Sequence, residues 1–527
     1  MCLPGWMTSP CKAGIIKAMF DLIIVGAGSA GSAIAARATE NPNLNVLLIE
    51  AGPDYPNVED TPFDLINSHN NSYTEHDWRF RYQPVRGRDV AFPRGRVVGG
   101  SSAVNTTIAL RGVPEDYDEW AELGNSEWSW ERVLPAFNRL ERDLDFGDRP
   151  YHGDAGPITI RRYPVEELMP QQQAFLETAR DIGYPDCQDQ NDPDGWGSGP
   201  QPMNKLGRLR VSCAIGYLAP ARLRPNLTIS PDTHVRRLIV EGRKCCGVEV
   251  ESATGATEII RATTVVLSAG ALMSPVILML SGIGPAAHLQ EVGVSTIFDV
   301  PGVGQNLCDH PALSVVARVR DPSIIDFDQP IIQTILRYTA EGSDKRNDLQ
   351  IEQISFAGRR EDANCFAIAA VLEYQYGRGE LRLASADPKA APIVDNRFCE
   401  DERDLQRLVG CMKDTLAFTQ KGALAEMIDE IIFPDPVRGR DDETLANLCR
   451  KLSGSGYHPS GTVKMGPSTD PLAVVDQYGC CHALDNLVVA DASIMPFVPR
   501  ANTNLTSIMI GEKIGEWMRT AGGRYGL

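Results

Sequence analysis

Three glycines near the start of the chain have the spacing that phosphate binding requires. Gly26, Gly28 and Gly31 form a GxGxxG pattern within the stretch FDLIIVGAGSAG. Glycines at these positions permit a tight turn, a close approach of the backbone to a pyrophosphate, and close packing of the next helix on the preceding strand. Glu50 follows at about the distance at which a carboxylate accepts hydrogen bonds from an adenosine ribose. These residue types in this order predict a dinucleotide site.

The segments around the glycines are the elements that such a site needs. An apolar run of the kind that a buried parallel strand requires is formed by Phe20, Leu22, Ile23, Ile24 and Val25. A helix of small residues is predicted over 32–38, and its N-terminus would direct free N–H groups at the phosphates. A second apolar strand is predicted over Val46–Ile49, directly before Glu50. GxGxxG alone is a weak signal, but strand, glycines, helix, strand and acid in register are a specific one.

Two further stretches carry residues suited to chemistry. Gly99, Gly100 and Ser101 in PRGRVVGGSSAVN would let the backbone run close to a planar or phosphorylated ligand and would add a hydroxyl donor. An ordinary glycine turn is the alternative. Near the C-terminus lies His458, and a histidine side chain, with an ordinary pKa of about 6.5, suits proton transfer near neutrality. From Leu505 onward apolar residues follow helical spacing, with Thr503 or Asn504 as the expected cap.

Composition restricts the class of protein. The chain has 527 residues, which predicts two domains, and its 43% hydrophobic and 23% charged residues are typical of a globular protein. A formal net charge of −18 argues against nucleic acid or an anionic membrane as a partner, since both would repel it. Thirteen cysteines without paired metal-ligand spacing predict reduced thiols, a cytoplasmic location and no metal site.

The ends of the chain and its apolar runs add expectations about targeting. Residues 1–18 contain two prolines and no long apolar run, so we expect a disordered tail rather than a secretory signal, with Met19 as an alternative start. The most apolar later stretch, residues 269–283, is broken by a serine, a proline and a glycine and falls short of the about 20 apolar residues that span a bilayer. We therefore expect no membrane segment.

Several motifs together resemble those of the glucose–methanol–choline (GMC) oxidoreductase family. The matching stretches occur in order from Phe20 to about Met518: GRVVGGSSAVN, GALMSPVILMLSGIG, PGVGQNLCDH, GRGELRLASADP, GYHPSGTVKMG and VADASIMPFVPRANTN. The resemblance implies an α/β FAD-binding Rossmann-like domain plus an α+β substrate-binding domain with an antiparallel sheet. We assign residues 19–160, 205–313 and 453–527 to the FAD-binding domain. Residues 161–204 and 314–452 are assigned to the substrate-binding domain.

The resemblance also implies the residues of the site. His458 matches the family's catalytic histidine, which takes the hydroxyl proton of an alcohol as hydride leaves for the flavin. Asn502 matches the second catalytic position, where its amide would hold the reacting oxygen; a loop or capping role is the alternative. The expected cofactor-binding residues are Gly26, Gly28, Ser29, Ala30, Gly31, Glu50, Ala51, Arg96, Gly99, Gly100, Ser101, Asn105, Thr106, Val235, Asp491, Ala492, Asn502 and Thr503.

The mode of FAD binding and the electron donor follow from what the sequence contains. The residue before Asn105 is Val104, where some family members have a nearby histidine that links covalently to the flavin, so we expect FAD to be non-covalent. One strand–GxGxxG–helix–acid unit is present, whereas a flavoprotein reduced by NAD(P)H usually carries two. We therefore expect electrons to come from the substrate and to pass to dioxygen or a quinone-type acceptor.

The leading hypothesis is oxidation of a primary, aromatic or heteroaromatic alcohol to the aldehyde. A choline-type substrate is an alternative because the Tyr457-His458-Pro459 sequence resembles that branch. However, residues 331–337, about where that branch offers a carboxylate to the quaternary amine, contain no acid. A non-redox lyase with a structural flavin and a non-catalytic nucleotide-binding protein are further alternatives. The sequence does not identify the alcohol, the electron acceptor or the oligomeric state.

Overall fold

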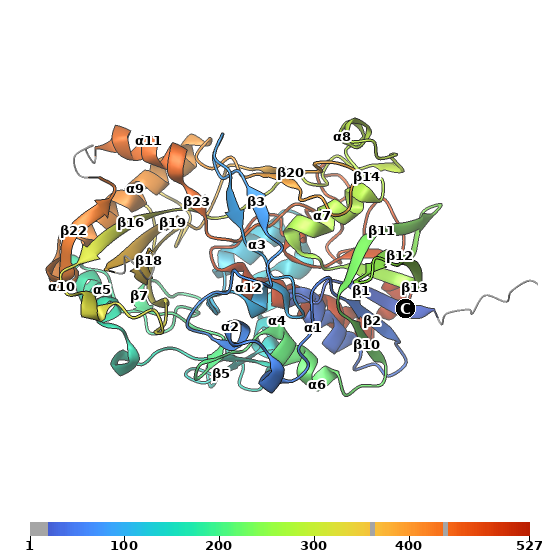
Figure 1. Cartoon of the computed structure of the whole chain (residues 1–527), viewed down its shortest axis with the longest axis horizontal. Helices are drawn as coiled ribbons and strands as arrows, with labels where there is room; N and C mark the ends of the chain where they lie inside the picture. Colours follow the sequence, from blue (N-terminus) through green and yellow to red (C-terminus); the bar gives the residue numbers. More distant parts are fainter. Residues whose placement is uncertain (1–18, 359–363, 436–440) are drawn as a thin grey trace, which may run out of the picture.

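Two seven-stranded sheets lie at opposite ends of the molecule, with the C-terminal helix between them (Figure 1). The computed structural model describes residues 19–358, 364–435 and 441–527. The predicted tail, residues 1–18, lies outside the described residues. This arrangement leaves the space between the two sheets as the place where segments from both ends of the chain meet.

The first sheet is built on the predicted glycine-rich strand. Its strand order is β10–β2–β1–β13–β12–β11, with β24 beside β13. The central strand β1 is parallel to β2 on one side and to β13 on the other, and its residues 22–24 are fully buried. An all-apolar run suits a strand that is covered on both faces. The strands are β1 (Phe20–Val25), β2 (Val46–Ile49), β10 (Leu227–Ser230), β11 (Thr233–Glu241), β12 (Lys244–Ser252), β13 (Thr257–Leu267) and β24 (Leu487–Val489).

Two helices bring their N-termini to the end of this sheet. Helix α1 (Ser29–Ala38) begins three residues before the predicted start, and helix α12 (Thr503–Thr520) packs along it. The packing is close because a Cβ at Gly511 would lie 2.4 Å from the carbonyl oxygen of Ala30. At the N-terminal ends, the Ser29 hydroxyl donates to Asn504 Oδ1 at 2.8 Å. Two positive helix ends therefore point into one region.

The predicted cap of α12 is wrong. Asn502 occupies the N-cap position, and its side chain makes no capping hydrogen bond. The reason is that the side chains in this turn have other partners: the Asn502 amide contacts His458, and Asn504 accepts from Ser29.

The second sheet is antiparallel, with the order β22–β16–β19–β18–β17–β7 and β23 beside β16. Helices α5 (Pro170–Ile182) and α9 (Glu402–Phe418) pack against it. The central strand β16 alternates buried and half-buried residues, as expected for a sheet with two different faces. The strands are β7 (Gly197–Pro200), β16 (Pro311–Val319), β17 (Ile332–Tyr338), β18 (Leu349–Ala357), β19 (Cys365–Leu372), β22 (Ile428–Phe433) and β23 (Gly454–Ser455).

Shorter elements connect the two sheets. They are α2 (Phe63–Ile66), β3 (Phe80–Tyr82), β4 (Val90–Phe92), α3 (Pro114–Glu122), α4 (Trp130–Leu140), β5 (Glu141–Asp143), β6 (Ile158–Ile160), β8 (Lys205–Leu206), β9 (Leu209–Arg210), α6 (Ala219–Ala221), α7 (Gly270–Leu280), β14 (Ile283–Gly284), α8 (Ala286–Glu291), β15 (Phe298–Asp299), β20 (Glu380–Arg382), β21 (Ile393–Asp395), α10 (Gly422–Met427) and α11 (Asp442–Leu452). None of the helices in the described part of the chain combines the length and apolarity that crossing a bilayer requires.

Candidate active site

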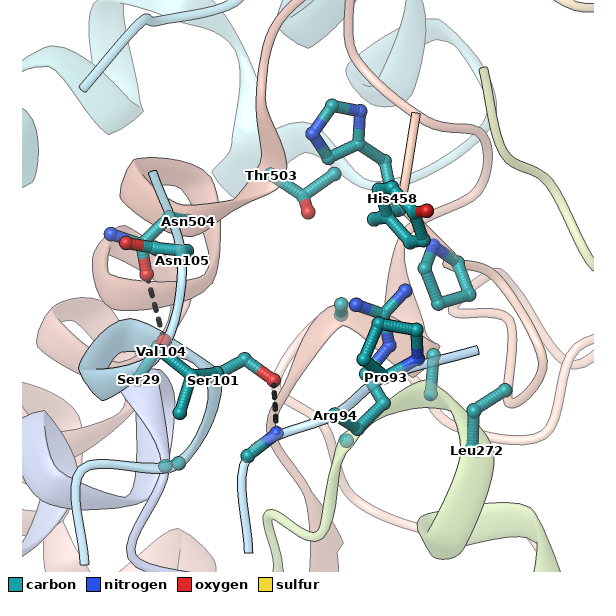
Figure 2. Close-up of a pocket in the computed structure, with 18 of the residues that line it drawn as sticks. Ser29, Pro93, Arg94, Ser101, Val104, Asn105, Leu272, His458, Thr503 and Asn504 are labelled. Atoms are coloured by element: carbon teal, nitrogen blue, oxygen red, sulfur yellow. Dashed lines mark hydrogen bonds between the residues drawn. The ribbon is translucent and has the colours of Figure 1, made fainter. Parts of the chain in front are cut away.

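A cavity of about 630 Å³ lies between the two sheets and is lined by residues from both. Its volume falls in the range of cofactor and small-molecule sites, about 300–1,000 Å³. Figure 2 shows Ser29, Ser101 and Asn105 on one side of a central space, with His458 and Thr503 above it and Arg94 across from them. The cavity therefore joins the predicted dinucleotide motif to the predicted catalytic histidine, although they are separated by more than 400 residues of sequence.

The two glycine turns form one wall of this cavity. Gly26 adopts φ +100°, a conformation that glycine reaches without strain, and a Cβ there would lie 2.4 Å from the carbonyl oxygen of Ser268. A Cβ on Gly100 would lie 2.6 Å from the Cα of Gly28, so the two turns touch through bare backbone. Because α1 begins at Ser29, its unpaired N–H groups face the same wall. This wall suits an anionic pyrophosphate.

The Glu50 carboxyl group is bound to the glycine loop as well as lining the cavity. Its Oε2 accepts from the N–H of Ala27 at 3.0 Å and its Oε1 from the N–H of Gly52 at 2.9 Å. Burial raises its pKa to about 7, although these N–H groups oppose the rise. A carboxylate oxygen has room for a second donor, so the predicted contact with a ribose remains compatible with these bonds.

The Asp491 side chain is held by three protein groups. It accepts from the N–H of Gly270 at 2.8 Å, from the hydroxyl of Ser274 at 2.5 Å and from the N–H of Ser493 at 2.7 Å. These bonds fix the start of α7 against the segment that carries Ala492, and both Asp491 and Ala492 line the cavity. The carboxylate thus shapes the wall.

Most of the predicted cofactor-binding residues line this cavity, and three do not. Gly31 lies behind the wall, where a Cβ would meet the carbonyl oxygen of Gly26, so its role is helix–strand packing. Arg96 is exposed and places its guanidinium over the ring of Trp78. Gly99 adopts φ +102° and packs against Ala103 and Ala214. The residues that line the cavity are Gly26, Gly28, Ser29, Ala30, Glu50, Ala51, Gly100, Ser101, Asn105, Thr106, Val235, Asp491, Ala492, Asn502 and Thr503.

The predicted catalytic pair is in contact. The Asn502 Nδ2 lies 3.1 Å from His458 Nε2. Since an amide nitrogen only donates, His458 Nε2 must carry a lone pair, and the ring is neutral with its proton on Nδ1. Burial, together with His310 and Arg94, lowers the pKa of His458 well below its ordinary value of 6.5. The structure therefore presents an unprotonated Nε2 beside an amide that has a second hydrogen to donate.

A second histidine, which the sequence analysis did not single out, fixes this ring. His310 Nδ1 lies 2.9 Å from His458 Nδ1, and Glu373 Oε2 lies 3.4 Å from His310 Nδ1. Burial lowers the pKa of His310 to about 3 and raises that of Glu373 to about 8. The Asp309 carboxylate accepts from the backbone N–H groups of His310 and His458 at 2.8 and 2.9 Å, which aligns the two segments.

Other residues in or behind the cavity wall also went unnoticed in the sequence, although signals existed for some. Arg94 stands two residues before the predicted Arg96, and its buried Nε and Nη2 have no hydrogen-bond partner in the part of the chain that the structure describes. His310 lies inside the family-like stretch PGVGQNLCDH. Glu352 and Glu373 lie in strand-like apolar segments without any motif, so no sequence signal marked them.

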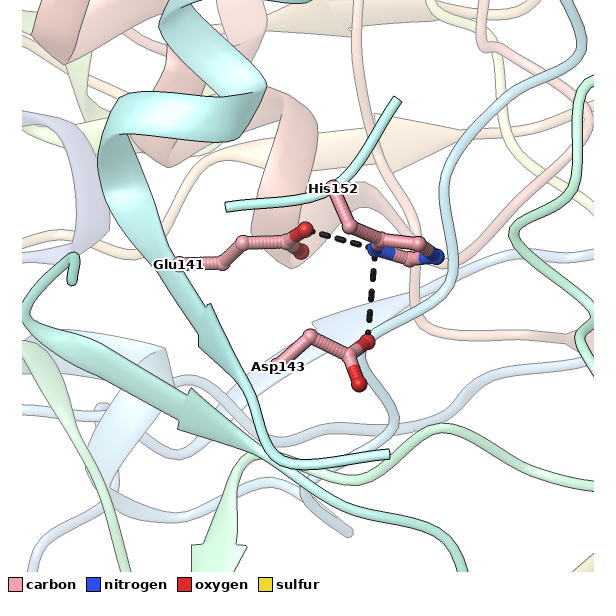
Figure 3. A group of neighbouring side chains, drawn as sticks. All are labelled: Glu141, Asp143 and His152. Atoms are coloured by element: carbon pink, nitrogen blue, oxygen red, sulfur yellow. Dashed lines mark hydrogen bonds and ion pairs between the residues drawn. The ribbon is translucent and has the colours of Figure 1, made fainter. Parts of the chain in front are cut away.

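A second cluster of titratable groups lies outside this cavity. Figure 3 shows Glu141 and Asp143 directed toward His152, and their ligand atoms lie close enough to hold a metal ion. Both ring nitrogens of His152 are already paired, Nδ1 with Glu141 at 2.7 Å and Nε2 with Asp189 at 2.8 Å. The guanidinium of Arg162 binds Asp143 and Asp189. We interpret the cluster as a buried ion-pair network that ties β5 to the segment around Asp189.

Fold and site together define a dinucleotide-binding protein in which a neutral histidine faces the cofactor cavity. Comparison with known families identifies it further. The GMC oxidoreductase models match residues 20–312 and 375–511. The chain therefore belongs to the GMC oxidoreductase family, whose members are FAD-dependent, and the family, the two-domain fold and the cofactor predicted from the sequence are confirmed.

Relatives of known activity cover nearly the whole chain. A 5-(hydroxymethyl)furfural oxidase from Methylovorus sp. (strain MP688) is 35% identical, over 95% of this chain and 99% of its own length. A choline oxidase from Arthrobacter globiformis is 34% identical, over 95% of this chain and 94% of its own length. The crystal structure of pyridoxine 4-oxidase from Mesorbium loti superposes with a TM-score of 0.87 at 30% identity, covering 94% of this chain and 98% of the other.

The cavity wall fits FAD. The bare glycine backbones leave room at the wall, and the N-termini of α1 and α12 supply positive ends for a pyrophosphate. The Ser101 hydroxyl, Asn105 and Thr106 add polar groups further along the same wall. Val104 lines the same cavity and carries no nucleophilic atom for a covalent link to the flavin.

Proposed function

We propose that this chain oxidises a primary alcohol to the aldehyde, with dioxygen or a quinone-type compound as the final electron acceptor. The observation that carries the proposal is the neutral His458 ring, whose unprotonated Nε2 lines the same cavity as the glycine turns. Bound FAD supplies the acceptor for the hydride that leaves the carbinol carbon. The chain itself must then bind the alcohol, remove its proton and exclude water.

His458 is proposed as the base. Its Nε2 lone pair would take the hydroxyl proton, and the ring already holds its other proton toward His310. The depressed pKa keeps the ring in the accepting form at neutral pH. The second N–H of the Asn502 amide would donate to the alcohol oxygen as negative charge develops there.

The remaining wall residues are proposed to hold the cofactor. Gly26, Gly28, Ser29 and Ala30 would bind the pyrophosphate, and Glu50, Ala51 and Val235 would bind the adenosine part. The other proposed contacts with the cofactor are Gly100, Ser101, Asn105, Thr106, Asp491, Ala492, Asn502 and Thr503. Gly31, Gly99 and Arg96 do not line the cavity and are proposed to support it from behind.

We propose an aromatic or heteroaromatic alcohol as the substrate. The substrate side of the cavity is lined by Ala312, Ile332, Ile354 and Val371, which suits a flat apolar ring. Two relatives are named for the oxidation of such compounds, 5-(hydroxymethyl)furfural and pyridoxine. Choline is the second candidate, favoured by the similarity to choline oxidase, although the strand over residues 332–338 offers no acid.

The domain boundaries and the location also belong to this proposal. The division into 19–160, 205–313 and 453–527 against 161–204 and 314–452 is supported by the pairing of β7 with β17 in the second sheet. A cytoplasmic location is supported by the cysteines, since no disulfide joins the eleven that the structure describes.

Anaerobic mixing with alcohols while the flavin absorbance is followed tests the proposal. We expect benzyl alcohol, 5-(hydroxymethyl)furfural or pyridoxine to bleach the flavin band, with one aldehyde formed for each flavin reduced. If the enzyme instead cleaved an alcohol without bleaching the flavin band, the activity would be that of a lyase. If no alcohol, choline included, bleached the flavin, the proposed function would be wrong.

A further inference from the structure

One face of the second sheet presents polar side chains to the substrate side of the cavity. In the β18–β19 register, Glu352 pairs with Ala369 and Gln350 pairs with Val371. Because side chains alternate along a strand, these four residues share a face. All four line the cavity, as does Glu373, which is two residues beyond Val371. Two carboxyl groups and an amide thus stand among apolar residues of this wall, with Ser314 on the neighbouring strand β16.

The Glu352 carboxyl group is fixed at one oxygen and unpaired at the other. Its Oε1 accepts from Gln201 Nε2 at 3.0 Å and from Gln350 Nε2 at 2.8 Å. Its Oε2 accepts no hydrogen bond from the residues that the structure describes, and the half-buried side chain lines the cavity. Two buried amides therefore hold this carboxyl group with one acceptor atom left for a ligand.

Among the unpaired buried atoms near Glu352, three are acceptors, while Arg337 Nε, on the strand beside Gln350, is a donor. Gln350 Oε1, Gln201 Oε1 and Glu373 Oε2 are buried without a hydrogen-bond partner within the described ranges. Gln350 itself is only 2% exposed and lines the cavity. A buried polar atom without a partner is costly, so such atoms indicate a missing ligand group. The group that satisfies a set of acceptors must bring a hydrogen-bond donor.

We propose that Glu352, held by Gln201 and Gln350, determines specificity by binding a second hydrogen-bond donor of the alcohol, remote from the hydroxyl that reacts. The preferred substrates are thereby alcohols with a second hydroxyl or a protonated nitrogen on the ring or its substituents, and alcohols without a second donor should be oxidised with a lower kcat/KM. Within the described residues no hydrogen bond or ion pair joins Glu352 to His458 or His310, so this site is separate from the base. Burial raises the pKa of Glu352 to about 7, and a ligand donor would favour its ionised form. The inference rests on the proposed alcohol oxidation.

Matched alcohols that differ in one donor test the proposal. We expect the wild-type enzyme to oxidise 1,3- or 1,4-benzenedimethanol with kcat/KM at least about tenfold higher than the corresponding (methoxymethyl)benzyl alcohol, which has the same shape but no second donor. The difference should lie mainly in KM. Choline, which carries a positive charge without an N–H donor on its nitrogen, should not be preferred over the diols.

Two substitutions at Glu352 test the chemistry of its carboxyl group. One keeps the shape of the side chain, and the other removes its polar group. Glu352→Gln is isosteric, but the amides of Gln201 and Gln350 would hold its carbonyl oxygen and turn its NH₂ group to the cavity. The variant should lose the preference for the diol. The NH₂ group of the new side chain would then face the second hydroxyl of the diol, and both groups are donors. Glu352→Leu should lose it too, because no acceptor then faces the second hydroxyl. Glu430→Gln, in an exposed ion pair on β22 of the same sheet, should keep the preference.

The outcomes separate the two proposals. If benzyl alcohols bleach the flavin but the wild-type enzyme does not discriminate the diol from its methyl ether, or Glu352→Gln discriminates as the wild type does, the role of Glu352 is overturned and alcohol oxidation stands. A preference for choline would also overturn it. If no alcohol bleaches the flavin, alcohol oxidation itself is overturned. The FAD absorbance of each purified variant reports folding independently of turnover.

Discussion

The Nδ1 atoms of His458 and His310 lie 2.9 Å apart, so one proton joins the two rings. Two positively charged imidazoles at this distance would repel each other in a buried site, and burial already lowers the pKa of both rings. The shared proton leaves the Nε2 of His458 unprotonated on the cavity side, where it accepts from the Asn502 amide. His310 therefore positions the proposed base by holding its tautomer.

Replacing His458 by alanine should slow flavin reduction by about 10²–10⁴-fold, the usual effect of losing a positioned general base. Raising the pH should restore part of the rate, because more alkoxide is then present in solution. Stopped-flow reduction across pH 6–10 measures both effects. Asn502→Ala is the matched control: it should also slow reduction but keep the wild-type pH dependence, since His458 remains. A His458→Ala variant that reduces its flavin at nearly the wild-type rate would contradict the assignment.

The pH dependence of the wild-type enzyme follows from the depressed pKa of His458. The neutral ring is the active form, so the acid limb that this ring sets in kcat/KM, measured with an alcohol that has no second donor, should lie well below pH 6.5. Arg94, after burial and His310, contributes to this depression. Arg94→Gln should therefore raise the pKa of His458 and move the acid limb to higher pH. Arg81→Gln removes the same charge from an exposed ion pair and should leave the limb in place. If the acid limb of the pH profile did not move in Arg94→Gln, the charge of Arg94 would not contribute to the lowered pKa of His458.

The β1–α1–β2 part of the first sheet could be predicted from the sequence because its signals are local. The glycine spacing, the apolar run before it and Glu50 all lie within 31 residues of Phe20, and β2 begins and ends where predicted. Helix α1 begins earlier than predicted because Ser29, Ala30 and Gly31 are small enough to continue the helix against β1. The His458–Asn502 contact also followed from motifs, since both residues stand in family-like stretches.

The acceptor cluster could not be predicted, because it depends on long-range pairing. Glu352 meets Gln201 only when β18 and the segment after β7 share a sheet, and their sequence separation is about 150 residues. Burial of Glu373 beside His310 likewise depends on the β16–β19 pairing. Neither strand carries a motif, and an isolated glutamate in a strand is more often solvent-exposed than buried.

FAD should be released intact when the purified yellow protein is denatured by acid or heat. The residue before Asn105 is Val104, which has no nucleophilic atom for attachment to the flavin. Precipitation of the protein and absorbance of the supernatant measure the release. Yellow colour that stays with the precipitated polypeptide would show a covalent link.

Glu50→Ala should weaken FAD binding far more than it alters the turnover of enzyme that has FAD bound. A hydrogen bond to a charged group contributes roughly 1.5–3 kcal/mol, which corresponds to about a 10- to 150-fold rise in Kd. The bonds from Glu50 to Ala27 and Gly52 add to this loss, because they hold the glycine loop in shape. Fluorescence titration of the apoprotein with FAD gives Kd. Normal FAD affinity combined with a large loss of the catalytic rate would place Glu50 in another role.

The stability of the folded protein should depend on pH through the protonation of His152. Burial lowers the pKa of this ring, but the bonds to Asp189 and Glu141 outweigh burial, and the net pKa in the folded protein is raised. A raised pKa contributes stability that is fully present below the ordinary pKa of about 6.5 and is lost as the pH rises through the folded value. His152→Gln should therefore lower Tm more at pH 6 than at pH 9, where the wild-type ring has lost part of its charge.

The control for the His152→Gln experiment is a histidine that does not lie between two carboxylates. His234 serves this purpose, because its Nε2 binds the backbone carbonyl of Pro388 and burial lowers its pKa instead of raising it. His234→Gln should show no extra loss of Tm at pH 6. Thermal unfolding at the two pH values, followed by circular dichroism and flavin release, gives the four differences. An equal Tm loss at both pH values in His152→Gln would show that the ring acts by packing alone, without charge.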